Sequence, residues 1–332
     1  SLSAAPELVR IDPELTWLAK VTFTPPVAML HAQLADPKDV VGRLMAVEAL
    51  GKRKDKTSVD KLKEALNEDL FHGVRQAASQ ALRSIGTEAA FDALRTSAKQ
   101  PDARVRRQVV TDLGSFYKPE ALAALKKSLA GEKNPAVRAA AIKALAGFGD
   151  AGAAGLIRKA LSSDSYRHEL GDAAVTALSK QDDPAGVEVL LKTLRDAAGK
   201  FTSRGYGSGM RALAYLARNE EDKSKVRRFL LGRLNHLNPR IRLVAIESLG
   251  NLGDPKAIAA LAKFAAGGEN SPDRKYAEAA IEKLRAARKP VDDFKNLRKE
   301  VTELRKANEK LGKQVEDLEK RFESTAQPEE KK

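Results

Sequence analysis

A short sequence pattern recurs along this chain about every 32 residues, and it constrains the fold more than any other feature. In most copies a valine or isoleucine is followed by an arginine, with a leucine seven residues after that arginine. The anchor leucines are Leu50, Leu82, Leu113, Leu145, Leu178, Leu249 and Leu284. A fixed period of this size indicates a repeat array, in which each unit buries its apolar face only against its neighbours. Because such arrays are mostly scaffolds and binding surfaces, the period argues against an enzyme.

Each repeat is expected to be a pair of antiparallel helices. In the second repeat, apolar residues at helical spacing predict one helix over residues 57–66 and another around Val74 to Ile85. Asn134-Pro135 and Asn238-Pro239 supply a helix cap followed by proline at the first helical position. We therefore predict an all-α fold, a right-handed α-α superhelix of about eight helix pairs over residues 26–289.

The arginines of the pattern share a helix face with the anchor leucines, because seven residues make nearly two helical turns. We expect them to have a structural role between repeats, bonding carbonyls or carboxylates of the neighbouring unit such as Asp39, Asp69 or Asp102. The repeat-structural residues are Arg43, Arg75, Arg106, Arg138 and Arg242.

The two ends of the chain do not follow the repeat. Residues 1–25 contain short β-branched and aromatic runs separated by Asp12-Pro13, which predict extended segments that pack on something else. Residues 290–323 carry apolar residues alternately three and four apart, which predicts a coiled-coil helix. Residues 324–332 are polar and are expected to be disordered.

The coiled-coil pattern has valine at two a positions, asparagine at another and leucine at each d position, which favours a parallel homodimer. The alternative is a single long helix folding back on the end of the array. The dimerisation residues would be Val301, Leu304, Asn308, Leu311, Val315 and Leu318.

Residues 195–210 lose the repeat register and read as a glycine-rich, basic, aromatic loop. The loop is either a plain insertion or a contact site for a partner. Gly199-Lys200 does not fit the spacing of a phosphate-binding loop, because Phe201 stands where serine or threonine is needed. The residues of the possible partner loop are Lys200, Phe201, Arg204 and Tyr206.

The formal net charge is +14, and residues 291–332 hold 11 basic and 11 acidic residues, so the whole excess lies on the repeats. Such a surface can attract an acidic partner, nucleic acid or an anionic membrane, although interspersed acids break up most basic runs and favour a soluble, lysine-rich surface. No apolar run is long enough to cross a membrane, and we expect no membrane association. The sequence leaves the compartment unknown, with a slight preference for the cytoplasm.

No catalytic, metal-binding or cofactor-binding set stands out. The chain has no cysteine and four histidines, none paired at metal-ligand spacing. His168-Glu169-Leu170-Gly171-Asp172 approaches the zinc motif HExxH, but Asp172 replaces the second histidine. We therefore expect no catalytic residue, no metal and no cofactor in this chain.

Two resemblances follow from these residues. The sequence pattern of residues 135–145 and 239–249 resembles HEAT-like repeats. Residues 9–23, running into residues 29–34 and 39–46, look like the junction between the β-sandwich and the C-terminal helical repeats in bacterial members of the aminopeptidase N family. That resemblance implies a non-catalytic C-terminal domain of a zinc aminopeptidase that shapes substrate access, with zinc only in a catalytic domain missing from this chain. The family's HExxH and GxMEN motifs are absent here.

Two other functions stay open. One is a stand-alone scaffold that binds a protein or peptide partner on its concave face. The other is nucleic-acid binding by the basic repeats, as in alkylpurine glycosylases built of HEAT-like helices, and we rank it last.

Overall fold

The computed structural model of this chain describes residues 6–14, 16–268, 271–286, 298, 300–311 and 314. Within these residues the chain forms α-helices and short 3-10 turns, with no strand. The prediction of an all-α array of helix pairs is therefore confirmed. The chain divides into two compact units, residues 1–212 and 213–332, and each is described by itself.

The first unit is built of helix pairs. Its elements are α1 (Val27–Ala35), α2 (Val40–Leu50), α3 (Lys56–Glu68), α4 (His72–Ile85), α5 (Glu88–Thr96), α6 (Ala103–Leu113), α7 (Pro119–Gly131), α8 (Pro135–Leu145), α9 (Ala151–Ala160), η1 (Tyr166–His168), α10 (Glu169–Gln181), α11 (Gly186–Asp196) and η2 (Ala198–Lys200). Helix α12 (Ser203–Ala217) crosses the boundary between the units.

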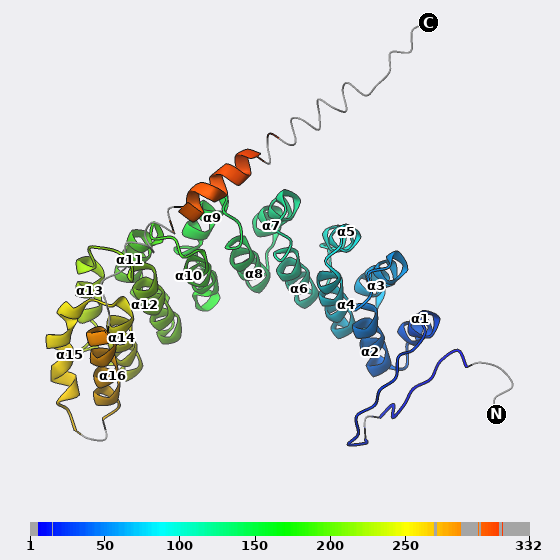
Figure 1. The fold of residues 1–332 in the computed structure, drawn as a ribbon, viewed down its shortest axis with the longest axis horizontal. Helices are drawn as coiled ribbons and strands as arrows, with labels where there is room; N and C mark the ends of the chain where they lie inside the picture. The colour runs from blue at the N-terminus through cyan, green and yellow to red at the C-terminus, as the bar shows by residue number, and fades with distance from the viewer. Residues whose placement is uncertain are drawn as a thin grey trace, which may run out of the picture. The chain divides into compact units, whose positions relative to one another are not determined.

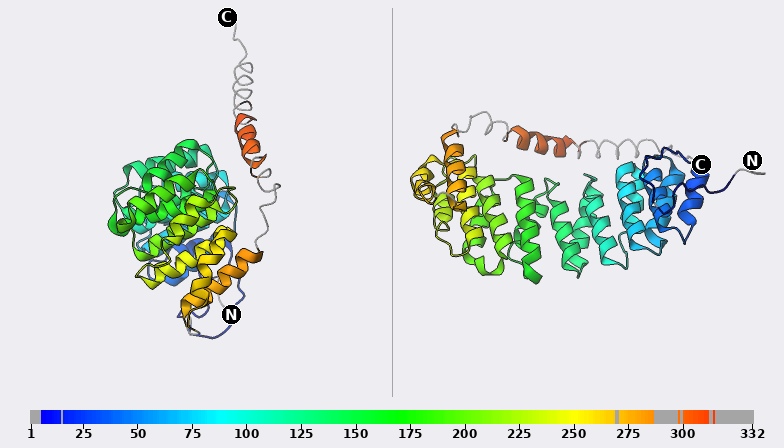
Figure 2. Two further views of the ribbon diagram at one scale, coloured as in Figure 1. Left: turned by 90° about the vertical axis from the view of Figure 1, so that its left-hand side faces the viewer. Right: turned by 90° about the horizontal axis from the view of Figure 1, so that it is seen from below.

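These helices form two layers in the first unit (Figure 1). The second helix of each pair packs on the second helix of the next pair, from α2 through α4, α6 and α8 to α10. We call this row the second-helix layer, and α1, α3, α5, α7 and α9 the first-helix layer. The right-hand view of Figure 2 shows the helices standing side by side.

The second unit continues the pairing with α13 (Ser224–Leu231), α14 (Pro239–Leu252), η3 (Pro255–Ala257), α15 (Ile258–Ala265) and α16 (Pro272–Ala286). Its main contacts join α14 to α16 and α15 to α16.

Side-chain caps start many of these helices. The carboxylates of Asp39, Asp55 and Asp150 each accept a hydrogen bond from a backbone N–H in the first turn of the following helix. Asn134 does the same for α8, with proline at its first position. The anchor leucines Leu50, Leu82, Leu113, Leu145 and Leu249 are fully or almost fully buried in the core.

Glycines let neighbouring second helices approach closely. A Cβ atom built on Gly114, just after α6, would lie 2.6 Å from the Cβ of Ala144 in α8. Gly51 packs on Ala81 in the same way, and in the second unit Gly250 packs on Ala280. This contact explains why glycine so often follows the anchor leucine.

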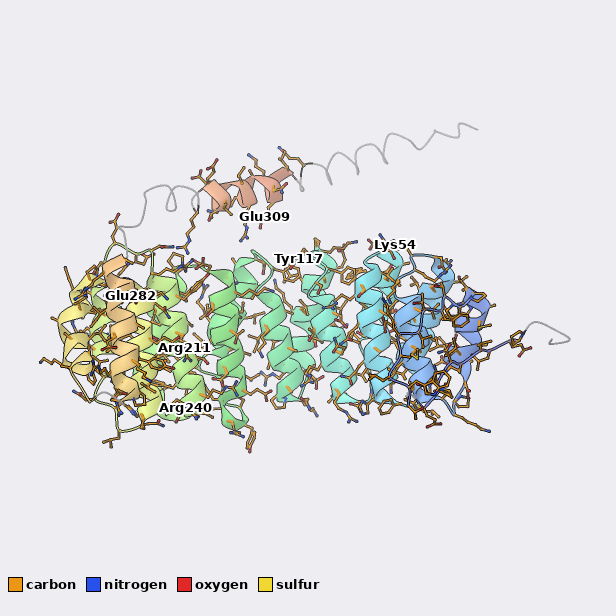
Figure 3. All side chains as sticks on the ribbon, turned by 60° about the horizontal axis from the view of Figure 1, so that its bottom comes forward. Lys54, Tyr117, Arg211, Arg240, Glu282 and Glu309 are labelled. Atoms are coloured by element: carbon orange, nitrogen blue, oxygen red, sulfur yellow. The ribbon has the colours of Figure 1, made fainter. Side chains whose placement is uncertain are left out.

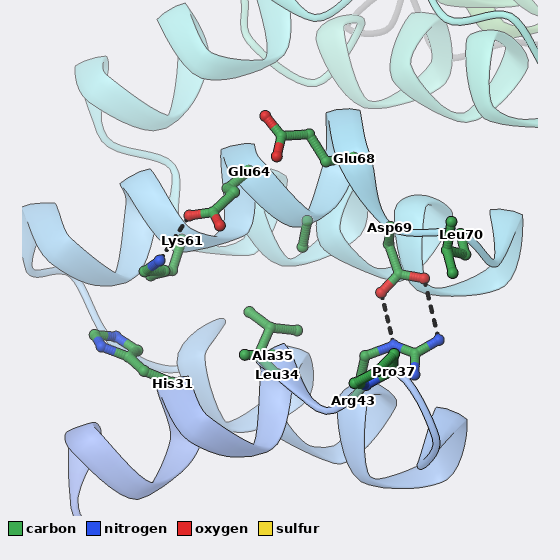
Figure 4. A pocket seen from close by; sticks show the side chains of 11 residues that line it. His31, Leu34, Ala35, Pro37, Arg43, Lys61, Glu64, Glu68, Asp69 and Leu70 are labelled. Carbon is green, nitrogen blue, oxygen red and sulfur yellow. Dashed lines mark hydrogen bonds and ion pairs between the residues drawn. The ribbon is translucent and has the colours of Figure 1, made fainter.

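The recurrent arginines lie at the junctions of successive repeats. In α2, Arg43 donates to the carbonyl oxygen of Asp36 at the end of α1, at 2.7 Å. Its Nε also donates to Asp69, which follows α3, at 2.7 Å (Figure 4). Both side chains are buried, with 5% and 6% of their surfaces exposed. Arg43 therefore ties the first helix of its own repeat to that of the next.

Three other arginines repeat this arrangement with different acceptors. Arg106 donates to the carbonyl oxygens of Gln100 and Pro101 and to the carboxylate of Glu132, whose pKa this pairing lowers. Arg75 bonds the carbonyl oxygen of Leu66 and the side chain of Gln100. In the second unit, Arg242 bonds the carbonyl oxygen of His236 and Asp273. We call the five recurrent arginines the arginine ladder.

Arg138 is the exception in the ladder. Its Nε is buried and has no hydrogen-bond partner. The ladder spacing of 26 residues points to Asp164, but Asp164 is exposed and pairs with Lys200 at 2.7 Å instead. The ladder is therefore interrupted between the pair α7–α8 and the pair α9–α10.

The N-terminal segment forms neither helix nor strand in residues 6–14 and 16–26. Arg10 joins it to the first repeat through a hydrogen bond from Nε to Asp39 at 2.5 Å. Trp17 is 66% exposed. The trailing strands of a β-sandwich that the aminopeptidase resemblance implies are therefore not present in the described part of this segment.

We predict that Gly114→Ala lowers the free energy of unfolding by about 1–3 kcal/mol, because the added methyl group overpacks the contact with Ala144. Urea denaturation measures the change, and adding Ala144→Gly should restore part of it. The matched control is Gly155→Ala in α9, where no atom lies within 4 Å of the new Cβ. That control should gain about 0.5–1 kcal/mol. Equal losses at the two sites would contradict the close-packing account.

We also predict that Arg43→Met costs about 3–5 kcal/mol, because it leaves the carboxylate of Asp69 buried without its partner. Arg138→Met is the control at the equivalent ladder position and should change stability by about 0.5 kcal/mol or less, because the Nε of Arg138 has no hydrogen-bond partner to lose. Thermal unfolding of both variants tests this. A loss at Arg138 as large as the loss at Arg43 would mean that the ladder ion pairs are not what stabilises the junctions.

Candidate functional site: the second-helix layer

The exposed face of the second-helix layer carries polar side chains at one repeated position. Gln80 of α4, Thr111 of α6, Lys143 of α8 and Thr176 of α10 are all exposed, and each lies two residues before an anchor leucine. Because the helices pack in register, these residues form one row across four repeats. We call them the exposed row.

Charge is divided unequally between three successive helices of one layer and three of the other. The side chains are drawn in Figure 3. Helices α3, α5 and α7 of the first-helix layer balance their charges, with six basic and six acidic residues. Helices α4, α6 and α8 of the second-helix layer hold a single acid, Asp112. Their lysines and arginines are Arg75, Arg83, Arg104, Arg106, Arg107, Arg138 and Lys143.

That single acid is used inside the layer. Asp112 is fully buried and accepts a hydrogen bond from Ser79 Oγ of α4 at 2.6 Å and others from Gln108. The Nε of Arg83 lies 3.5 Å from its carboxylate. Burial raises the pKa of the Asp112 carboxyl, against the hydrogen bonds from Ser79 and Gln108 that lower it. Asp112 thus joins α4 to α6 and presents no negative charge on the exposed face.

This network was not predicted from the sequence. Its one signal is that Asp112 stands directly before the anchor leucine, where α4 and α8 have alanine. An acid at a position that is otherwise small and buried predicts a polar contact between repeats.

The expected irregular loop over residues 195–210 needs correction, because its second part begins helix α12. The glycines there serve close packing: a Cβ on Gly205 would lie 2.3 Å from the carboxylate of Asp172, and one on Gly209 would lie 2.6 Å from Leu194. A glycine-rich run that resembles a loop in sequence is therefore the first half of a helix.

The four residues of the possible partner loop do not form one exposed surface. Phe201 is buried and its ring centroid lies 4.2 Å from that of His168. The hydroxyl of Tyr206, also buried, donates to the carbonyl oxygen of Leu194 at 3.2 Å. Lys200 pairs with Asp164, and Arg204 is exposed on α12.

The sequence that approaches a zinc motif begins at His168, which is buried and adopts a left-handed φ of 59°. Its Nε2 has no hydrogen-bond partner, and burial lowers the pKa of its ring. Burial raises the pKa of the neighbouring Asp172. Among the residues that the structure describes, no three histidine, cysteine, aspartate or glutamate side chains gather as a metal site requires.

A pocket of about 190 Å³ lies between α1, α2 and α3 (Figure 4). The Arg43–Asp69 pair closes one side, and Lys61 bonds Glu64 at 2.7 Å within it. His31 lines the pocket and has a buried Nε2 without a partner. Four of the charged groups that line the pocket are therefore paired with one another.

The C-terminal residues of the predicted dimer are helical over residues 300–311. Val301, Leu304 and Leu311 are 42%, 62% and 56% exposed, and Asn308 is exposed as well. Val315 and Leu318 lie outside the described residues, as does the segment expected to be disordered. In the part of the chain that is described, no helix combines the length and apolarity needed to span a bilayer.

Comparison with known proteins identifies the repeats. A family model described as HEAT repeats matches residues 26–111, 71–134, 97–169, 122–204 and 210–285. No curated protein matches the chain.

Several solved structures are similar to the chain. The human deoxyhypusine hydroxylase in complex with glycerol is 19% identical over 78% of this chain and 96% of that one, with a TM-score of 0.34. The YibA protein of E. coli is 18% identical over 72% and 95%, with a TM-score of 0.47. Kap121p bound to Ste12p is 15% identical over 78% of this chain and 32% of that one, with a TM-score of 0.57. At this identity the last likeness is one of fold alone.

The resemblance to the aminopeptidase N family is wrong, and with it the function of an accessory domain of a peptidase. The comparisons give no sign of an aminopeptidase domain. Residues 40–46, which carry part of that resemblance, are the start of α2, and their valine, arginine and alanine belong to the pattern that recurs in most of the repeats here. Since the matched model extends from residue 26 to residue 285 with only residues 205–209 left out, this chain belongs to the HEAT-repeat family.

Proposed function

We propose that this protein is a non-enzymatic scaffold that binds a protein or peptide partner on the exposed face of the second-helix layer. The observation that carries the proposal is the exposed row, in which Gln80, Thr111, Lys143 and Thr176 occupy the same position in four successive repeats. HEAT repeats commonly bind proteins, which supports this choice over catalysis.

The spacing of the row suits an extended peptide. Packed helices lie about 8–10 Å apart, and an extended chain advances about 3.3 Å per residue. Every third residue of such a peptide would therefore meet the next member of the row. The helices themselves are held by the arginine ladder and the glycine contacts, so the row is a rigid surface rather than a set of loops. The proposed binding requires neither metal nor cofactor.

We predict that a photoreactive amino acid at Thr111 or Thr176 forms a covalent adduct with a partner protein in cell extract. The same amino acid at Lys127, exposed on α7 of the first-helix layer, is the control and should form none. Gel shift and mass spectrometry of the adduct measure the result. Adducts from Lys127 but from neither threonine would place binding elsewhere and contradict the proposal.

We further propose that the chain forms a parallel homodimer through its C-terminal helix. Val301, Leu304 and Leu311 are exposed at a and d spacing, where a second copy would cover them. Glu300 and Arg305 occupy g and e positions and would attract across the two helices.

Leu304→Lys combined with Leu311→Lys should convert a dimer of twice 36.0 kDa into a monomer, because two charges would enter the helix interface. Light scattering after size exclusion measures the mass. Lys306→Gln, on the opposite side of the same helix, should leave the dimer intact. A monomeric mass for the unaltered protein would exclude dimerisation through this helix.

A further inference from the structure

We propose that the partner of the second-helix layer is an acidic peptide segment, whose carboxylates are bound by the cations of α4, α6 and α8. This inference rests on the proposed scaffold function and names the chemical class of its partner. It starts from the unequal charge of the two layers: three successive second helices carry seven lysines and arginines, while their single acid is buried.

Not all seven cations are available to a partner. Arg75 and Arg106 are engaged in the arginine ladder, and Arg83 lies beside the buried carboxylate of Asp112. Arg138 is half-buried, and the exposed cations that remain are Arg104, Arg107 and Lys143.

These three differ in how far they are neutralised. Arg104 pairs with Asp102, the cap of its own helix, but 58% of the arginine side chain stays exposed. Arg107 and Lys143 make no ion pair within 4 Å in the described part of the chain, although the charge of Lys143 acts on the Asp172 carboxyl and opposes the rise in its pKa. Solvent-exposed cations without a close ion-pair partner favour a ligand that brings its own carboxylates.

The position of these cations suits a ligand that approaches closely. Helix α8 presents Ala136, Ala140 and Ala144 on its half-buried positions, and these short side chains leave the longer cations standing above the helix. Helix α6 lies directly beside α8, since Gly114 packs on Ala144. Arg107 and Lys143 are therefore exposed on two adjacent helices.

The basic surface of α4, α6 and α8 ends at the next second helix, α10. The next second helix, α10, carries Glu169 and Asp172 in its first turn, both partly exposed. An acidic ligand is repelled there, so it should lie over α4, α6 and α8 only. Three helices at about 10 Å spacing cover about 20 Å, or roughly six residues of extended chain.

The same cations could attract nucleic acid, but the lack of aromatic side chains on α4, α6 and α8 favours a peptide over a single-stranded nucleic acid. Single-stranded nucleic acids bind by stacking their bases on aromatic side chains. Helices α4, α6 and α8 contain no phenylalanine, tyrosine or tryptophan. Carboxylates need no such stacking partner and match the fork of an arginine guanidinium.

The test measures binding of a fluorescein-labelled octapeptide of alternating aspartate and alanine by fluorescence anisotropy, at about 50 mM salt where charge attraction is strong. The matched probe replaces each aspartate with asparagine. The full-length protein is compared with two triple variants that change the net charge equally. The first carries Arg104→Glu, Arg107→Glu and Lys143→Glu on the second-helix layer. The second carries Lys56→Glu, Lys127→Glu and Lys159→Glu on the exposed surface of α3, α7 and α9.

We expect the aspartate peptide to bind the unaltered protein and the first-helix variant, and to lose about tenfold or more in affinity on the second-helix variant. The asparagine peptide should bind none of them measurably. Circular dichroism verifies folding, and the milder pair Arg107→Gln with Lys143→Gln gives a second reading if the triple variant is unstable.

Several results would overturn the inference. Equal losses in the two triple variants would show that only net charge matters. Tighter binding of duplex DNA or single-stranded RNA, lost in the same second-helix variant, would make nucleic acid the ligand. Absence of peptide binding while Thr111 still forms adducts with a partner would reject an acidic ligand and leave the scaffold standing. Absence of both would reject the scaffold as well.

Discussion

The junction between successive repeats is the contact on which the rest of this structure depends. A helix pair of some 30 residues cannot bury its own apolar face, so its stability comes from the neighbouring pair. Here the junction combines two devices. Glycines after the anchor leucines bring second helices close together, as at Gly114 and Ala144. On the side of the turns, ladder arginines such as Arg43 join a carbonyl of one repeat to an acid of the next.

These junctions also explain the charge of the surface. Many acids of the array serve at helix ends, where Asp39, Asp55 and Asp150 cap helices and where Asp69 and Glu132 receive the ladder arginines. The second helices themselves retain their cations with little to neutralise them. In the first unit the basic residues are therefore not evenly spread, because α4, α6 and α8 hold seven basic residues and one acid while α3, α5 and α7 hold six of each. Because many acids are used at the helix ends, the exposed surface of α4, α6 and α8 is left basic.

Much of this fold could be predicted from the sequence, since the period, the anchor leucines and the asparagine–proline caps each have a direct physical meaning. The positions of the ladder arginines followed from seven-residue spacing. Their partners did not: the ladder spacing assigns Asp164 to Arg138, yet Lys200 pairs with Asp164 from a segment far along the chain. The glycine run before Met210 indicated a loop, because sequence alone cannot distinguish glycines of a turn from glycines that admit a neighbouring helix.

The candidate site was harder to predict than the fold. The sequence showed that the positive charge lies on the repeats. The assignment of the charged residues to one layer or the other depends on how the helices of each pair pack. The pattern of the repeats assigned no role to Asp112, and its contacts with Ser79 and Gln108 show that it is withdrawn from the surface. The aminopeptidase resemblance failed because part of it, residues 39–46, follows the pattern of the repeats, and because the non-repeat residues 9–23 form no strand in their described part.

The most direct test of this account is to map where an acidic peptide contacts the protein in solution. Amide chemical shifts of the deuterated full-length protein would be followed during titration with the aspartate octapeptide. We predict that the largest changes cluster on the exposed faces of α4, α6 and α8, around Thr111 and Lys143, and stop at Glu169 in α10. Changes confined to the first-helix layer or to the turns, or shifts spread evenly over the surface, would contradict the claim that the second-helix layer is the binding face.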